Sequence, residues 1–179
     1  MNQKEARAEI ARLASSGIAR SEIYARLSGR GIKDRKLAWL LASYADPRLL
    51  EANQKYIGWV VLIACAQTAM GFIDGFGIGE KISVGAGWLV GVATIAFGLL
   101  FAWGFYRNKV GAYNAYLLAA IIQLPFQLDD LAGSPLGGTV EVAIGLALLG
   151  YVWWVRNRIF PDFAFMSPRK ANRAYVFSD

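Results

Sequence analysis

Long stretches without a charged side chain constrain this chain more than any other feature. Three runs, at residues 56–73, 82–106 and 110–128, contain no Asp, Glu, Lys or Arg, and a fourth apolar run at 136–155 contains only Glu141. A helix of about 20 apolar residues crosses the hydrocarbon layer of a bilayer. The sequence therefore predicts four membrane-spanning helices. Four buried helices of a water-soluble protein are disfavoured, because runs of this length are hard to bury in 179 residues.

The charged residues gather outside these runs and divide the chain into three regions. Residues 1–50 are predicted to form a cytoplasmic helical head, residues 51–158 the four-span bundle, and residues 159–179 a basic and aromatic tail that lies on lipid headgroups or packs against the head. The predicted fold class is therefore all-α: an integral membrane four-helix bundle with a small three-helix domain at its N-terminus.

Helical spacing of apolar residues in the head predicts three short helices. The first is expected over residues 3–16, with Gly17 ending it, and the third is expected to stop at Asp46-Pro47. Ser21 and Asp34 are expected to cap the second and third helices, because their side chains accept hydrogen bonds from free backbone N–H groups. The inward-facing residues are expected to be Ala6, Ile10, Leu13, Ala14, Ile23, Tyr24, Leu27, Leu37, Leu40 and Leu41.

The distribution of Lys and Arg predicts how the chain is oriented. Eleven lie in residues 1–55, two in residues 107–109 and five after Val155, so 18 of 19 fall on one side and only Lys81 on the other. Basic connections stay in the cytoplasm, so both termini are predicted to be cytoplasmic, in a bacterial inner membrane. Four tryptophans near this side are expected to anchor the helices at the lipid interface: Trp59, Trp103, Trp153 and Trp154.

Small residues recur about four apart in the second predicted span, at Ser83, Gly87, Gly91 and, further along, Gly98. Such rows let helix backbones approach closely in lipid, where burial of apolar surface provides no driving force. We expect them to pack helices within one chain, although a homodimer seam would use the same residues. Three glutamines inside the spans, Gln67, Gln123 and Gln127, are expected to form hydrogen bonds to other helices.

Most catalytic chemistry is excluded by composition. The chain contains no histidine, which removes the usual acid–base, nucleophile and zinc systems built on imidazole. A single cysteine, Cys65, excludes an intramolecular disulfide and any paired-cysteine metal site. The glycines of residues 75–79 lack the Lys-Ser/Thr of a phosphate loop, so we expect a tight connection there. No enzyme activity, cofactor or metal is predicted.

The acidic residues of the predicted outer side form the candidate site for a partner. Asp74 follows the first span, Asp129 and Asp130 end the third, and Glu141 lies one turn into the fourth. A structural role would also account for acidic residues in such places, because they help keep a connection outside the cell and stabilise a helix when they lie near its N-terminus. Glu141 is different, because an ionisable group inside the membrane boundary is costly and marks a functional candidate.

A loose motif, Leu-x3-Gly-x3-Ser-Glu-Ile-x3-Leu over residues 13–27, resembles the first half of the helix-turn-helix unit of resolvase-type DNA-binding domains. Residues 28–33 are longer than the compact turn of that unit. The net charge of +5 over residues 1–55 suits nucleic-acid phosphates, and equally an anionic membrane surface. Because the head is tethered to a membrane, we expect it to contact lipid or protein rather than nucleic acid.

In size, number of spans and lack of catalytic motifs, the chain resembles the membrane immunity proteins that protect bacteria from pore-forming toxins. Its head is also similar to that of proteobacterial inner-membrane proteins of unassigned activity. The resemblance implies a non-enzymatic binding protein of the inner membrane, surrounded by lipid, whose protein partner is a membrane-active toxin. Two alternatives stay open: a small transporter or channel subunit, as a single chain or a homo-oligomer, and a membrane-tethered regulator that uses the head.

Overall fold

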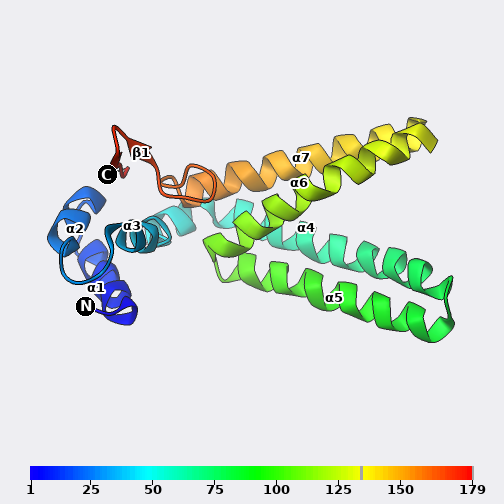
Figure 1. Cartoon of the computed structure of the whole chain (residues 1–179), viewed down its shortest axis with the longest axis horizontal. Helices are drawn as coiled ribbons and strands as arrows, with labels where there is room; N and C mark the ends of the chain where they lie inside the picture. Colours follow the sequence, from blue (N-terminus) through cyan, green and yellow to red (C-terminus); the bar gives the residue numbers. More distant parts are fainter. Residues whose placement is uncertain (134, 179) are drawn as a thin grey trace. The chain divides into compact units, whose positions relative to one another are not determined.

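The structure, a computed structural model, describes residues 1–133 and 135–178, without the side chains of residues 126–136. Secondary structure in this part of the chain is helical apart from one pair of two-residue strands (Figure 1), which confirms the predicted all-α class. The elements in chain order are α1 (Gln3–Ser15), α2 (Arg20–Leu27), α3 (Asp34–Ala42), α4 (Pro47–Glu80), α5 (Val84–Tyr106), α6 (Val110–Gly133), α7 (Pro135–Ile159), β1 (Lys170–Ala171) and β2 (Ala174–Tyr175).

The chain forms two compact units. The first consists of Met1–Asn53 together with Trp154–Asp179, and the second of Gln54–Trp153. The first unit therefore combines the head and the tail with the beginning of α4 and the end of α7. It contains 15 of the 19 basic residues and 8 of the 13 acidic ones, a net charge of +7, whereas the second unit has a net charge of −1.

The head packs around one apolar core, as the spacing of its sequence predicts. Ala6, Ile10 and Leu13 of α1 are buried against residues from α2 and α3. The partners in this core are Ile23, Leu27, Leu37, Leu40 and Leu41. Gly17 follows α1 with φ +75°, a conformation that favours glycine, and its N–H donates to the carbonyl of Ala14.

The ends of α2 and α3 differ from the expectation. The residues at the cap positions are Ala19 and Lys33, and neither side chain makes the capping hydrogen bond. Ser21 and Asp34 lie inside the first turn of their helices. The Asp34 carboxylate accepts a hydrogen bond from the Ser28 hydroxyl at 2.8 Å. Its negative charge also stabilises α3, because it lies at the positive end of the helix dipole.

In the second unit, α4 and α5 approach each other at glycine residues. A Cβ atom placed on Gly87 would lie 3.1 Å from the carbonyl oxygen of Phe76, and one on Gly91 would lie 2.7 Å from the Phe72 ring. A Cβ atom on Gly98 would collide with the Thr68 side chain. Ser83 has a different position, because it caps α5 through a hydrogen bond that its hydroxyl accepts from the Ala86 N–H.

The prediction of a connection at residues 75–79 is wrong, because α4 continues as a helix to Glu80. Two of the three glycines in this segment lie against α5: a Cβ atom on Gly75 would lie 2.9 Å from the Thr94 hydroxyl, and one on Gly79 would lie 2.5 Å from the carbonyl oxygen of Ala86. Asp74 consequently lies within α4 rather than in the connection after it. Most of the stability of a helix in a protein comes from packing on its neighbours, and α5 supplies that contact at Gly75 and Gly79.

Polar side chains join the helices of the second unit at a few points. Of the three predicted interhelical hydrogen bonds, that of Gln67 is confirmed, since its Oε1 accepts from the Tyr116 hydroxyl of α6 at 3.0 Å. Gln123 is exposed, and the side chain of Gln127 lies outside the described ones. Thr94 of α5 donates to the carbonyl of Gly71 at 3.0 Å. Next to the connection between α5 and α6, the rings of Phe105 and Tyr113 lie 4.8 Å apart, and both side chains are fully buried.

Three helices are long and apolar enough to cross a membrane: α4, α5 and the Gly137–Ile159 part of α7. The remaining predicted span, residues 110–128, lies in α6, whose described apolar part, Val110–Pro125, is shorter. Pro125, the last residue of this apolar part, lies inside α6 and not at its end. The structure therefore confirms a helical protein with three candidate membrane spans, and the layout with four spans stays a prediction.

Candidate functional site

The tail folds onto the head through the buried carboxylate of Asp162, which is 1% exposed. Arg20 of α2 donates from Nη1 to Oδ2 of Asp162 at 2.5 Å. Oδ1 accepts hydrogen bonds from the backbone N–H and the hydroxyl of Ser178, both at 2.6 Å. A buried charge requires such partners, so this carboxylate ties the beginning and the end of the tail to the head.

Aromatic side chains extend this contact between head and tail. The Tyr24 ring of α2 lies 5.8 Å from the Tyr175 ring and 5.3 Å from the Phe177 ring. Trp39 of α3 meets Phe163 edge to face at 6.5 Å. Burial is the main cause that raises the pKa of the Tyr24 hydroxyl above its usual value, and the nearby Asp34 and Tyr175 raise it further by electrostatic repulsion of the ionised form. Of the two uses expected for the tail, the structure shows packing against the head.

Arg156 shapes the loop that follows α7. Its side chain is fully buried and donates to the carbonyl oxygens of Ala164, at 3.2 Å, and Phe165. Its guanidinium also lies 5.3 Å from the centre of the Phe163 ring. A planar group with five N–H donors can hold several backbone carbonyls at once, so Arg156 sets the course of the loop that leads to Met166.

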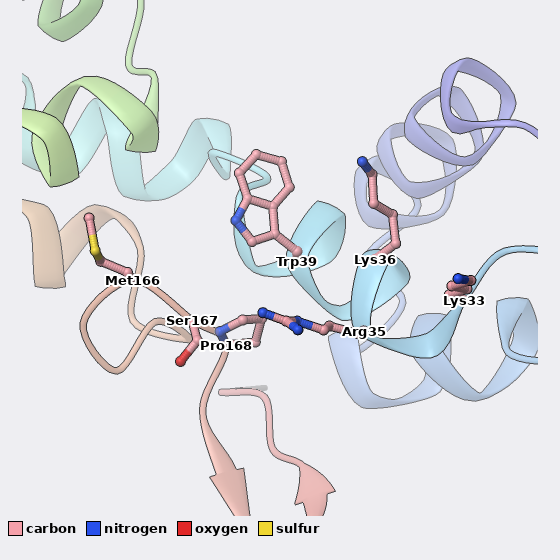
Figure 2. Close-up of a pocket in the computed structure, with 7 residues that line it drawn as sticks. All are labelled: Lys33, Arg35, Lys36, Trp39, Met166, Ser167 and Pro168. Atoms are coloured by element: carbon pink, nitrogen blue, oxygen red, sulfur yellow. The ribbon is translucent and has the colours of Figure 1, made fainter.

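A pocket of about 430 Å³ lies between α3 and this loop (Figure 2). We call it the basic pocket, because three of its seven lining residues are cationic and none of the seven is acidic. The lining residues are Lys33, Arg35, Lys36, Trp39, Met166, Ser167 and Pro168.

The basic pocket combines exposed charges with an apolar wall. Lys36 and Trp39 are three residues apart on α3 and point to the same side of it, while Arg35 extends toward Ser167 and Pro168 of the loop (Figure 2). The three basic side chains are exposed, Trp39 is half-buried, and Met166 is 44% exposed. Such a lining suits an anion that carries an apolar group.

Two of the four acidic residues predicted as a partner site have side chains that the structure describes. Asp74 is exposed on α4, and Glu141 is exposed on α7. The backbones of Asp129 and Asp130 are helical, in α6, but their side chains lie outside the described ones. Among the described residues, no group of three or more Asp, Glu or Cys side chains could hold a metal ion.

The tryptophans predicted at the lipid interface are largely accessible. Trp59 is 50% exposed and Trp103 is 53% exposed, while Trp154 is also exposed and Trp153 is half-buried. Two of them lie next to cations: the Lys109 ammonium is 4.3 Å from the centre of the Trp103 ring, and the Arg158 guanidinium is 4.2 Å from that of Trp154. Aromatic rings beside basic groups are typical of the headgroup region.

Sequence reasoning missed the basic pocket. Its helical half carries a visible signal, since Lys36 and Trp39 are three residues apart on α3 and share a helix face, and Lys33 directly precedes this helix. Its other half comes from Met166 and Ser167, more than 120 residues away in the sequence, and only the folded tail brings them to α3.

No protein-family model, no curated protein and no solved structure matches the chain.

Proposed function

We propose that this chain is an integral membrane protein that crosses the bilayer four times, through α4 to α7. The supporting observation is the exposed apolar surface of these helices. Of the large apolar side chains exposed in the described part of the chain, all but Met166 and Val176 lie between Trp59 and Trp154. Water would penalise such a surface by about 25 cal/mol for each Å², whereas lipid tails would cover it.

The orientation we propose places both termini, and with them the head and the tail, in the cytoplasm. The first unit carries a net charge of +7 and the second a net charge of −1. Positive charge is retained on the cytoplasmic side during insertion. In a bacterium this places the chain in the inner membrane.

The function we propose is non-enzymatic binding, and specifically immunity to a membrane-active toxin. A cationic toxin that reaches the outer side would meet exposed carboxylates, of which Asp74 and Glu141 have accessible side chains. Complementary charge increases the association rate of two proteins more than it increases their affinity. The alternative, ion transport, depends on Glu141 as the ionisable group within a span.

Binding to the toxin candidate encoded by the adjacent reading frame tests the immunity proposal. We expect this partner to associate with the detergent-solubilised chain, and Asp74→Asn to slow association and to weaken its dependence on salt. Asp46→Asn changes the same charge in the head and is the matched control, with no effect expected. Absence of binding, or equal loss in both variants, would contradict immunity.

Ion flux separates binding from transport. In liposomes containing the purified chain, we expect no proton or cation flux above that of empty liposomes, both for the unchanged chain and for Glu141→Gln. A flux that the unchanged chain supports and Glu141→Gln abolishes would replace the binding proposal by a channel or transporter.

A further inference from the structure

We propose that the basic pocket binds the headgroup of an anionic phospholipid. The phosphate would lie among Lys33, Arg35 and Lys36, and the glycerol with the first acyl carbons against Trp39 and Met166. The proposal rests on the proposed function in one respect, namely that α4 and α7 cross a bilayer.

Charge selects an anion for this pocket. Its three cations are exposed, and there is no acidic residue among the lining residues. Asp34, the acid next to them in the sequence, accepts a hydrogen bond from Ser28, which is not among the lining residues. Each basic residue near an anionic membrane surface contributes about 1 kcal/mol of attraction, which corresponds to about a fivefold change in affinity.

The apolar wall selects a lipid among anions. A free phosphate ester would leave Trp39 and Met166 in contact with water alone, whereas a lipid places its glycerol and acyl carbons on them. Nucleic acid fits less well, because single-stranded binding needs aromatic faces open for stacking. Trp39 is half-buried, and its ring is engaged edge to face with Phe163.

The chain also keeps the pocket close to a membrane. Only residues 43–46 separate α3 from α4, and four residues extend over at most about 14 Å. On the other side, Met166 follows the end of α7 after residues 160–165. Both walls of the pocket are therefore joined by short segments to helices that contain candidate membrane spans.

Direct binding of short-chain lipids to the full-length chain in a neutral detergent tests the proposal. The probes are dihexanoyl phosphatidylglycerol, dihexanoyl phosphatidylcholine, glycerol 3-phosphate and a short single-stranded oligonucleotide. We expect phosphatidylglycerol to bind at least about tenfold more tightly than the other three. Tighter binding of glycerol 3-phosphate would identify a soluble phosphate ester as the ligand, and tighter binding of the oligonucleotide would identify nucleic acid; either overturns the proposal.

Variants with matched charge assign the binding to the pocket. The double variant Arg35→Gln with Lys36→Gln should weaken phosphatidylglycerol binding about 30-fold, about fivefold for each charge. Lys4→Gln with Arg7→Gln removes the same charge from exposed positions of α1 and should change the affinity less than about threefold. Met166→Gln should weaken phosphatidylglycerol binding roughly threefold and leave glycerol 3-phosphate binding unchanged.

Equal losses of phosphatidylglycerol affinity in the two double variants would show that net charge alone attracts the lipid. The assignment of the binding site to the basic pocket would then be wrong. Extraction of cell membranes with alkaline carbonate is run in parallel. A chain that resists extraction but does not discriminate between the lipids contradicts only this inference. A chain that is extracted contradicts the proposed function as well.

Discussion

At the scale of single residues, the carboxylate of Asp162 shows how burial changes the contribution of an ion pair to stability. Arg20 and Asp162 are 9% and 1% exposed, whereas Arg26 and Glu22, joined by a similar contact at 2.6 Å, are each about half exposed. Removing one partner of a buried pair leaves an uncompensated charge and costs about 3 kcal/mol or more. An exposed pair contributes about 0–1 kcal/mol, because water screens both charges.

We therefore expect Asp162→Asn to release the tail. Trypsin cleavage after Arg169, Lys170 and Arg173 under native conditions should become about 100-fold faster, which corresponds to about 3 kcal/mol less resistance to local opening. The cleavage rate is measured by mass spectrometry of the released C-terminal peptide.

Glu22→Gln is the control for this variant, since it removes a carboxylate from an exposed pair on the same helix as Arg20. Its cleavage rate should change less than about fivefold. Equal acceleration in both variants would show that the buried pair does not hold the tail.

At the scale of secondary-structure elements, contact between α4 and α5 depends on where glycine lies. Gly98 faces Thr68 so closely that a Cβ atom has no room, while Gly71 has nothing within 4 Å of the position of its Cβ. Both are helical, so replacement by alanine raises helix propensity equally, by about 1 kcal/mol. Any difference between the two variants therefore reports packing between helices.

Gly98→Ala should destabilise the folded chain by about 1–3 kcal/mol through overpacking. Gly71→Ala should leave the stability unchanged or raise it. Thermal unfolding in one detergent gives the comparison, and gel filtration of both variants gives the oligomeric state. Equal stability of the two, together with dissociation of an oligomer in Gly98→Ala alone, would assign this glycine to a homodimer seam instead.

At the scale of the whole molecule, the distribution of charge predicts the orientation in the membrane. In a chain with Cys65→Ser, we expect Lys81→Cys to react with a membrane-impermeant thiol reagent in intact cells. Ser15→Cys should react only after the cells are opened. Lys81 is the one basic residue of the predicted outer side, so its removal strengthens the charge difference that sets the orientation.

Labelling of Ser15→Cys in intact cells would contradict the orientation, and the outer position of Asp74 with it. A denatured sample in which both cysteines react is the control for expression. If both positions react only in opened cells, they lie on the same side of the membrane. A single span then does not separate residues 15 and 81, and the role of α4 as a span is excluded.

Much of the helical structure could be predicted from the sequence, because a helix is encoded by residues close together in the chain. The 3.6-residue period placed Ile10, Ile23 and Leu37 in the core of the head, where they are fully buried. The prediction of where α4 ends is wrong, since the glycines after Asp74 suggest a turn by composition, whereas the chain stays helical to Glu80 and Gly75 and Gly79 pack on α5. Composition and period over a few residues carry no information about which helix will pack alongside.

The sequence by itself determined the apolar helices, the head and the uneven charge, because composition and period act over a few consecutive residues. The tertiary structure alone decided the candidate site. Arg20 and Asp162 are 142 residues apart, and the two walls of the basic pocket are separated by the whole second unit of the chain. Contacts of such long range leave no periodic trace in a single sequence, since periodicity records only residues that are close together in the chain.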